Sequence, residues 1–533
     1  MDKILSLVTI LLTLCVCHNT GAATWYVDAE VEVPGDGTSW ETAFQKIQEG
    51  INAASHADTV IVAEGAYLEN IQFEGKNIVL RCTDPLDPDI VANTIIDGNQ
   101  SGSVVTFSGD EDATCVLAGF TIRNGSSDKG GGICGGKHDN HSHATIRNNT
   151  ISNNASFHGG GLAYCDGTIQ GNAISGNSAS WDAGGLDRCN GIIRNNIITG
   201  NVAGLHGGGL VYCDGTIQNN TISGNRLTDK SGEGGGLHLC HGTITDCIIW
   251  GNLASHNPEL LHSSLPSYSC IRKCEGGGVG NISAPPHFVD PAQGDYHLQS
   301  WSPCIDAGNP DSPFPNEPEP NGGRINMGAY GNTPEAASKS PDADEDQLPD
   351  DWELKFFSNL AQGGSDDPDH DSKTNTQEYH LALDPTLPVG LDANWYVDAS
   401  RPTSGNGLSW QTAFRAIKEG INAAYDAEVV AVKEGTYFEN IELRGYNIIL
   451  TSTRPLDPTV VASTVIDGTP RHLRFDPLVC FRGTENETCV LSGFTIRNGH
   501  SERGGGISAT WGETTHATIR NNIISENHAQ FGG

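Results

Sequence analysis

The chain has 533 residues, which is too long for one ordinary hydrophobic core, so we expect several domains. It contains 66 glycines, 18% of its residues are charged, and its formal net charge is −35. This negative balance argues against a nucleic-acid partner, because phosphates would be repelled and the sequence has no basic stripe. An acidic polysaccharide would also be repelled overall unless bound cations bridged it to the protein.

The N-terminal segment 1–23 has the pattern of a secretory signal peptide. Lys3 supplies the positive start, an apolar run covers residues 4–17, and the small residues 21–23 (GAA) form the expected cleavage site. The apolar run is too short for a comfortable membrane span, and no later segment could cross a membrane as a helix. We therefore expect a secreted protein that is extracellular or held at the cell surface, with lipid attachment at Cys17 as the alternative for this segment.

The sequence contains a duplicated domain. Residues 25–29 (WYVDA) recur at 395–399, and residues 119–125 (GFTIRNG) recur at 493–499. Each copy opens with apolar residues at helical spacing, which predicts a short capping helix ahead of many short strands. The second copy stops at Gly533, which corresponds to the start of the regular repeats in the first copy. Because a stack cut at this point would expose an unpaired edge, we expect the C-terminus to be incomplete.

A regular repeat runs through the middle of the first copy. Four residue types recur in it, always at intervals of 24, 24 and 27 along the chain: Leu162, Leu186, Leu210 and Leu237; Cys165, Cys189, Cys213 and Cys240; Ile169, Ile193, Ile217 and Ile244; Asn177, Asn201, Asn225 and Asn252. A fixed period of this size is typical of one unit stacked on itself. Each unit has three short apolar strands between polar turns, which predicts an all-β parallel β-helix, and the usual crossover hand favours the right-handed form.

Stacking also explains the polar and sulfur columns of the repeat. Asparagines at equivalent turns can hydrogen-bond side chain to side chain along the stack. The recurring cysteines are interpreted as small apolar core residues. Disulfides are the alternative, because neighbouring turns lie about 4.8 Å apart, within the Cα range of a disulfide.

The repeats, of the form GGGL followed by TI, Asn and GN, resemble the right-handed parallel β-helix repeats of the pectin-lyase-like superfamily. They are also similar to the repeats of chlamydial polymorphic outer-membrane proteins. The resemblance implies the fold and leaves the activity open, because that superfamily includes lyases, hydrolases, esterases, adhesins and inert spacers. The signatures of pectinesterases and polygalacturonases are absent from the sequence.

Residues 263–340 are expected to close the first solenoid. Cys270, Cys274 and Cys304 are the best candidates for a disulfide. Residues 286–330, with the motifs FVDP at 288–291 and SPCIDAG at 302–308, resemble the choice-of-anchor segment that ends bacterial surface β-helix proteins. That resemblance implies association with a surface, and the alternative is a simple Pro/Gly-rich cap on the last turn.

Two acidic loops with the same spacing of side chains occupy the linker 341–390. Positions 1, 3, 5, 7, 9 and 12 are Asp342, Asp344, Asp346, Leu348, Asp350 and Glu353 in the first loop, and Asp367, Asp369, Asp371, Lys373, Asn375 and Glu378 in the second. Oxygen ligands at these positions are what a Ca²⁺ shell requires, and position 7 contributes a backbone carbonyl. The alternative is a solvated acidic linker.

The acidic loops are similar to the calcium repeats related to thrombospondin type 3 and to dockerins, which implies Ca²⁺ as a cofactor. Position 6, usually Gly, is Gln347 or Ser372 here, so a lower affinity is expected. Clustered carboxylates repel one another when no metal is bound, so the linker should order only with calcium.

Two columns of variable residues precede the repeated leucines. His158, Asp182, His206 and Glu233 lie four residues before them, and Phe157, Trp181 and Leu205 lie one residue earlier. Histidines and carboxylates beside aromatic rings could hold a sugar chain or a divalent ion, and the alternative is that these are turn residues. Arg188 and Arg194 belong to two further columns that could line a groove for an acidic glycan.

These observations divide the chain into a signal peptide (1–23), a first β-helix (24–262), a cap (263–340), a calcium module (341–390) and a second β-helix (391–533). The expected function is that of a secreted or surface-displayed, adhesin-like rod, stiffened by calcium, that binds carbohydrate or other extracellular partners. The alternative is a polysaccharide lyase, or another carbohydrate-active enzyme, acting on an acidic glycan. The sequence identifies no catalytic residues.

Overall fold

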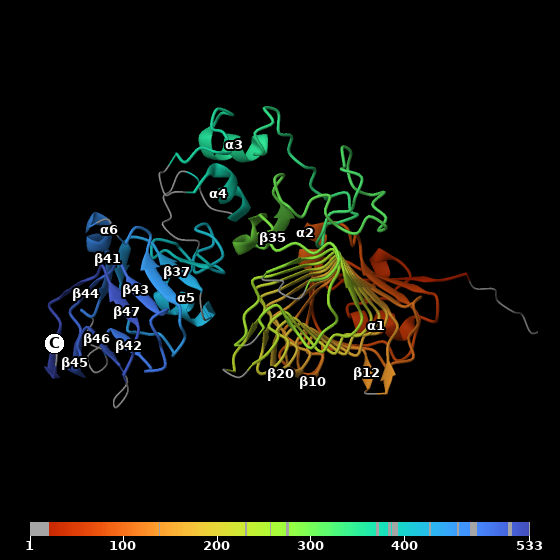
Figure 1. Cartoon of the computed structure of the whole chain (residues 1–533). Coiled ribbons are helices and arrows are strands. Elements are labelled where there is room, and N and C mark those ends of the chain that lie inside the picture. Colours follow the sequence, from red (N-terminus) through yellow and green to blue (C-terminus); the bar gives the residue numbers. More distant parts are fainter. Residues whose placement is uncertain are drawn as a thin grey trace, which may run out of the picture.

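The computed structural model describes residues 21–137, 139–229, 232–255, 257–272, 277–368, 373–381, 385, 393–425, 428–455, 458–469, 477–509 and 514–531. Within these ranges the chain forms two right-handed parallel β-helices joined by a loop-rich segment with two short helices (Figure 1). Residues 1–20, which carry most of the predicted signal peptide, lie outside the described ranges. None of the helices in the described part of the chain combines the length and apolar character that a membrane crossing needs.

Three parallel sheets form the wall of the first β-helix. Sheet A contains β1 (Thr24–Val27), β2 (Thr59–Val62), β5 (Val79–Cys82), β8 (Val116–Ala118), β14 (Thr145–Arg147), β18 (Thr168–Gln170), β22 (Ile192–Arg194), β26 (Thr216–Gln218) and β30 (Thr243–Thr245). Sheet B contains β3 (Gly65–Leu68), β6 (Thr94–Asp97), β9 (Thr121–Arg123), β15 (Thr150–Ser152), β19 (Ala173–Ser175), β23 (Ile197–Thr199), β27 (Thr221–Ser223), β31 (Ile248–Trp250) and β33 (Cys270–Ile271). Sheet C contains β4 (Ile71–Gln72), β7 (Val105–Thr106), β11 (Ile133–Cys134), β17 (Leu162–Ala163), β21 (Leu186–Asp187), β25 (Leu210–Val211), β29 (Leu237–His238) and β32 (Leu260–Leu261). The register pairs Leu162 with Leu186 and Leu186 with Leu210, so one interval of the sequence repeat is one turn of the solenoid.

A fourth sheet, which the sequence pattern did not predict, lies between sheets B and C in each middle turn. Sheet D contains β10 (Ser126–Lys129), β16 (Ala155–His158), β20 (Ser178–Asp182), β24 (Val202–Ala203) and β28 (Arg226–Leu227). Its strands are rich in polar and small residues, and β20 is largely exposed. They therefore lack the apolar signal by which the other three strands of the turn were recognised. The small hairpin of β12 (Gly136–Lys137) and β13 (Asn140–His141) projects from the same side.

The repeated columns form the interior of the first solenoid. The recurring leucines, isoleucines and cysteines are almost fully buried in one continuous apolar cluster. The cysteines are free thiols, which confirms their interpretation as core residues. The asparagine column is buried too, and Asn177 Nδ2 donates to Asn201 Oδ1 at 3.0 Å while Asn201 Nδ2 donates to Asn225 Oδ1 at 2.9 Å. The predicted side-chain bonding along the stack is therefore confirmed.

Short helices cover the N-terminal end of each solenoid and one of its corners. In the first copy these are η1 (Trp40–Thr42), α1 (Ile47–Ala53) and α2 (Pro88–Asn93). Ile47 and Ile51 of α1 are buried in the solenoid core, which confirms the predicted capping helix. Asp87 caps α2 by accepting hydrogen bonds from the backbone N–H groups of Asp89 and Ile90.

The segment 263–340 runs back along the side of the first solenoid as well as over its end. It contains β34 (Phe288–Asp290), η2 (Pro291–Gln293) and β35 (Asp295–Leu298). Asn195 lies in a turn well before the last one, and its Nδ2 donates to the carbonyl oxygens of Ala329 and Gly331 at 3.0 and 2.8 Å. Cys270 and Cys304 are buried in one apolar cluster as free thiols, and Cys274 lies outside the described residues.

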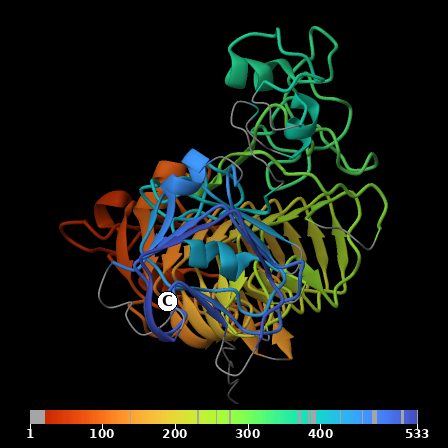
Figure 2. The same ribbon diagram turned by 60° about the vertical axis from the view of Figure 1, so that its left-hand side comes forward.

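The linker module stands above both solenoids in Figures 1 and 2 and is built on α3 (Asp350–Phe357) and α4 (Asn375–Leu381). Its core is Trp352, which packs with Leu348 and with Trp301 of the preceding segment. Tyr379 of α4 reaches the same place, where its hydroxyl donates to the Trp301 carbonyl at 2.9 Å. The module is therefore docked on the cap of the first solenoid through aromatic contacts.

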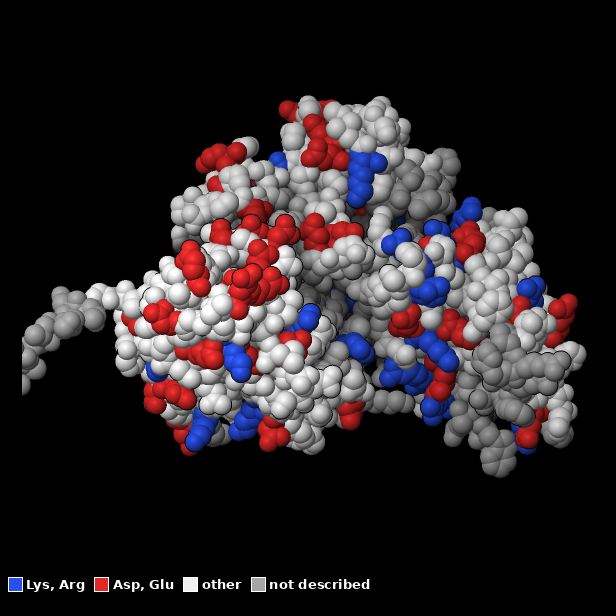
Figure 3. Space-filling model, turned by 180° about the vertical axis from the view of Figure 1, so that it is seen from behind, with Lys and Arg blue, Asp and Glu red and all other residues white. Residues whose placement is uncertain are grey.

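The second β-helix repeats the first over a shorter length. Its strands are β36 (Trp395–Val397), β37 (Val429–Val432), β38 (Gly435–Tyr437), β39 (Ile441–Glu442), β40 (Ile449–Ser452), β41 (Thr464–Asp467), β42 (Val479–Phe481), β43 (Val490–Ser492), β44 (Thr495–Arg497), β45 (His500–Arg503), β46 (Ile507–Ala509), β47 (Thr518–Arg520), β48 (Ile523–Ser525) and β49 (His528–Phe531), and its helices are α5 (Ile417–Ala423) and α6 (Pro458–Ser463). Its opening turn meets the closing turns of the first copy, where the Arg272 guanidinium lies 4.5 Å from the Trp395 ring centre. A cleft of about 940 Å³ remains between the copies, lined in part by Arg226, Lys418 and Arg444, and Figure 3 shows basic side chains gathered beside it.

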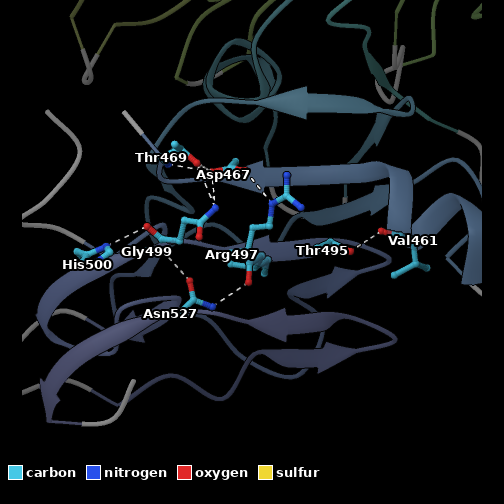
Figure 4. Close-up of polar contacts among 10 residues, drawn as sticks. Val461, Asp467, Thr469, Thr495, Arg497, Gly499, His500 and Asn527 are labelled. Atoms are coloured by element: carbon cyan, nitrogen blue, oxygen red, sulfur yellow. Dashed lines mark hydrogen bonds and ion pairs between the residues drawn. The ribbon is translucent and has the colours of Figure 1, made fainter. Parts of the chain in front are cut away.

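A buried carboxylate at the end of one strand organises the same corner in both copies. In the second copy, Asp467 accepts hydrogen bonds from Arg497 Nε at 2.7 Å and Asn498 Nδ2 at 3.0 Å, and also from the Thr469 hydroxyl (Figure 4). Burial of Asp467 opposes its ionisation, but these hydrogen bonds outweigh that effect and hold its pKa at about 2. Asp97 occupies the same position in the first copy and bonds Arg123 Nε at 2.9 Å.

Candidate functional site

The predicted column of histidines and carboxylates is continuous in the structure. Lys129 pairs with His158 and His158 with Asp182 along sheet D, and isolated bridges continue the column from Asp182 to His206 and from His206 to Glu233. We call these five residues the His–carboxylate column. It runs along the side of the solenoid where β10 and β20 are labelled in Figure 1.

Asp182 lies between two imidazoles of this column. Its Oδ1 is 2.8 Å from His206 Nδ1, and its Oδ2 is 3.5 Å from His158 Nδ1. The Asp182 side chain is only 8% exposed, whereas the two histidines are partly open to solvent. The hydrogen bond from Asp182 thus fixes the orientation of the His206 ring and leaves its Nε2 available for a ligand, whereas His158 Nδ1 is buried without a hydrogen-bond partner.

An exposed aromatic pair lies beside the column. Phe157 and Trp181 precede His158 and Asp182, and their ring centroids are 5.9 Å apart with only 20° between the ring planes. Their exposed fractions are 48% and 47%, so the rings are not part of the core. Large exposed apolar side chains that lie together on adjacent turns are candidates for contact with a ligand.

His238 joins the column from a different part of the turn. It ends β29 of sheet C, and its ring stacks on that of His206 with centroids 4.5 Å apart and an interplanar angle of 8°. Its Nε2 lies 3.9 Å from the Glu233 carboxylate. Burial is the main reason that the pKa of His238 falls to about 4, so its ring is neutral at neutral pH. The repeat spacing places His238 in register with Asp187 through Val211, but it does not indicate that the His238 ring reaches His206.

A buried ion pair lies two turns earlier on the same sheet. Asp187 ends β21 and is fully buried, and Arg188 Nη1 lies 2.6 Å from its Oδ2. Burial raises the pKa of the Asp187 carboxyl, although Arg188 opposes the shift. The Arg188 guanidinium also lies 4.5 Å from the Tyr212 ring centre. A buried carboxyl with a raised pKa beside a second carboxylate, Asp182, is a common feature of functional sites.

Arg194 is not brought to this site. It belongs to β22 of sheet A, where it is exposed and its Nε donates to Gln170 Oε1 at 3.1 Å. Arg188 instead directly follows β21 of sheet C and pairs with Asp187, which interacts electrostatically with His158 and Asp182 of the His–carboxylate column.

The first acidic loop is folded around a common centre. One carboxylate oxygen each from Asp342, Asp344 and Asp346 lies within 4.8 Å of the others. Asp342 accepts hydrogen bonds from the backbone N–H groups of Asp346 and Gln347, both at 3.1 Å. Gln347 adopts φ = +79°, the left-handed conformation for which Gly is usual at position 6, so the departure in residue type does not change the path of the loop.

Glu353, at position 12 of this loop, is fully buried and neither of its carboxylate oxygens has a hydrogen-bond partner. Burial and the four neighbouring aspartates raise the pKa of its carboxyl to about 7. Leu348, at position 7, is buried in the module core, and Asp350 Oδ1 accepts from the Ala343 N–H at 2.7 Å. A bound cation would satisfy the buried Glu353 carboxylate, so the donor set fits Ca²⁺.

The second acidic loop is described only in part. Asp369 and Asp371 lie outside the described residues. Of the remaining positions, Asn375 and Glu378 are fully buried on α4, and Asn375 Oδ1 has no hydrogen-bond partner. Asp367 and Lys373 also lie within the described residues. Buried oxygen atoms at positions 9 and 12 are what the calcium prediction requires of this loop.

A family model agrees with the fold of the first solenoid. The family model "Right handed beta helix region" matches residues 71–252. No curated protein matches this chain. Among solved structures, the crystal structure of pectate lyase Pel9A is similar at 12% sequence identity and a TM-score of 0.32, over 58% of this chain and 96% of that one.

Proposed function

We propose that this protein is an extracellular or cell-surface rod that binds an extended polysaccharide along the His–carboxylate column. The observation that carries the proposal is the exposed Phe157–Trp181 pair, whose rings lie nearly parallel on adjacent turns. Such rings can stack against the apolar faces of successive sugars, while the neighbouring His158, Asp182 and His206 offer hydrogen-bonding groups for the hydroxyls. A solenoid suits this role because it repeats the same surface at every turn.

Calcium has a structural part in this proposal. Ca²⁺ bound by the first loop would neutralise the buried Glu353 and its aspartate neighbours. The same loop leads into α3, whose Trp352 packs on Trp301, and the Lys355 ammonium lies 4.8 Å from the Trp301 ring centre. Calcium would therefore order the module that is docked on the first solenoid, and so stiffen the joint between the two copies.

Glycan binding is tested with the purified full chain in calcium-containing buffer. Affinity electrophoresis in gels that contain pectate, alginate, chondroitin or neutral polysaccharides gives a dissociation constant for each. We expect Trp181→Ala to weaken binding of the preferred polysaccharide about tenfold, because a stacked aromatic anchor contributes on the order of 1 kcal/mol or more. The matched control is Phe438→Ala, which removes a somewhat more exposed aromatic ring (57%) from the second copy. The assignment of this glycan-binding site would be refuted if the polysaccharide slowed the migration of Trp181→Ala, Phe438→Ala and the wild type equally.

A second candidate function is catalysis on an acidic glycan, as a polysaccharide lyase or a related carbohydrate-active enzyme. The buried Asp187–Arg188 pair beside Asp182 favours it, because Arg188 could neutralise a uronate carboxylate and a carboxyl of raised pKa can exchange a proton. The assay follows absorbance of unsaturated product from pectate, alginate and chondroitin. Product that Arg188→Ala abolishes and Arg194→Ala preserves would establish the activity, since Arg194 lies on sheet A.

A further inference from the structure

We propose that His206, Glu233 and His238 form a binding site for a divalent transition-metal ion of the Zn²⁺ type on the side of the first solenoid. One potential ligand atom from each of the three residues lies within 4.8 Å of the other two. The residues come from two consecutive turns, and Glu233 and His238 flank the Gly-rich corner that precedes β29. The site is distinct from the acidic loops of the linker and does not depend on the proposed binding of glycans.

The buried state of His238 points to a missing ligand. Its side chain is 5% exposed, yet neither ring nitrogen has a hydrogen-bond partner, and the Glu233 carboxylate lies 3.9 Å from Nε2. A polar ring buried without partners is unfavourable, and most such rings in proteins are hydrogen-bonded or bound to a metal. A cation held between His238 and Glu233 would satisfy both groups.

His206 can supply the second imidazole ligand. Its ring lies nearly parallel to that of His238, with centroids 4.5 Å apart, so a turn of one ring about its Cβ–Cγ bond would bring one nitrogen of each ring to a common ion. Its Nδ1 is held by Asp182 Oδ1 at 2.8 Å, which leaves Nε2 as the nitrogen free for a metal. A histidine that binds metal through one nitrogen and bonds a carboxylate through the other is the usual arrangement around Zn²⁺.

The ligand set selects the class of metal. Two imidazoles and one carboxylate suit Zn²⁺ and related transition-metal ions, whereas Ca²⁺ takes oxygen ligands and has its own candidate site in the linker. Three protein ligands leave at least one coordination position open, and Glu233, at 37% exposure, places that position toward solvent. The site begins one turn beyond Asp182, on the His–carboxylate column that the aromatic pair Phe157 and Trp181 flanks.

The test is a calorimetric titration of the full chain with Zn²⁺ in buffer that contains excess Ca²⁺, which occupies the acidic loops. We expect one equivalent of Zn²⁺ to bind. Glu233→Gln and His206→Ala should each weaken this binding more than about 100-fold, and Asp182→Ala should weaken it about 10- to 100-fold because it only orients His206. The control His500→Ala removes an exposed histidine from the second copy and should leave Zn²⁺ binding unchanged.

A second readout separates this site from adventitious binding. Co²⁺ in place of Zn²⁺ should give visible absorption of a low-coordinate, nitrogen-bound ion in the wild type, and Glu233→Gln should lose it. The melting temperatures of the metal-free proteins show whether each variant is folded, and Glu233→Gln is the decisive one because it is isosteric and partly exposed. The proposal is wrong if folded Glu233→Gln binds Zn²⁺ as tightly as the wild type, or if the wild type binds none.

Discussion

The asparagine column makes a quantitative prediction about what holds the solenoid together. Asn201 is fully buried in the middle of this column. Its Oδ1 accepts from the backbone N–H and the side-chain Nδ2 of Asn177, both at 3.0 Å. Its Nδ2 donates to the Ile174 carbonyl and to Asn225 Oδ1, both at 2.9 Å. Asn201→Ala removes all four of these hydrogen bonds and leaves the Asn177 N–H buried without its acceptor.

The expected loss in the free energy of unfolding is large for a single substitution. An unsatisfied buried N–H costs about 1–3 kcal/mol, and each further hydrogen bond contributes about 0.5–1.5 kcal/mol net. We therefore expect Asn201→Ala to lower the free energy of unfolding by about 3–5 kcal/mol. Asn190→Ala, in the same turn, should cost no more than about 1 kcal/mol, because its exposed side chain accepts one hydrogen bond, from the Asp214 N–H.

Two measurements check this prediction. Urea denaturation followed by circular dichroism gives the change in the free energy of unfolding. Hydrogen exchange resolves where it occurs, since each turn of a solenoid contacts only its neighbours and the protection should fall first around turns 172–225. A loss below about 1 kcal/mol for Asn201→Ala, or a loss equal to that of Asn190→Ala, would show that stacking of the apolar columns suffices without the asparagines.

Three further predictions concern other parts of the chain. The pKa of Asp467 is lowered from 3.8 to about 2, so its ionised carboxylate contributes about 2 kcal/mol of stability above pH 4, and this contribution is lost as the pH falls through 2. Asp467→Asn should remove this pH-dependent contribution, and urea denaturation of the wild type and the variant from pH 5 to pH 2 measures the difference in unfolding free energy between them. Calcium at about 100 times its dissociation constant should stabilise the linker by about 2.7 kcal/mol in a melting experiment. Glu353→Gln should abolish that effect, whereas Glu345→Gln, on an exposed residue of the same loop, should keep it; an unchanged melting temperature with calcium would contradict the metal assignment. Burial raises the pKa of Cys213 well above its usual range, so an aromatic disulfide reagent should label this thiol only after unfolding, and labelling of the native protein would be evidence against the buried column.

The candidate site was only partly predictable from the sequence. The repeat places equivalent residues directly above one another, so the order His158, Asp182, His206 follows from spacing alone. His238 comes from the next strand of the turn, and nothing in the spacing says that the chain folds back so that this ring lies on that of His206. Arg188 and Arg194 were equivalent candidates in the sequence, and they are separated because one follows sheet C and the other lies in sheet A.

The sequence by itself determined that this protein is a stack of similar turns, because apolar residues that recur at a fixed period are buried when each turn is placed on the one before. It therefore predicted the solenoid, the buried thiols and the asparagine column. Only the tertiary structure decided how residues are arranged around each turn. The polar strands of sheet D carry no apolar signal, and the left-handed conformation of Gln347 is imposed by the carboxylate contacts of its loop rather than by its own preference. The repeat period thus determines which residues are neighbours on adjacent turns of the solenoid. Which residues are neighbours within one turn depends on the path of the connecting loops, and that path is set by contacts distant in sequence.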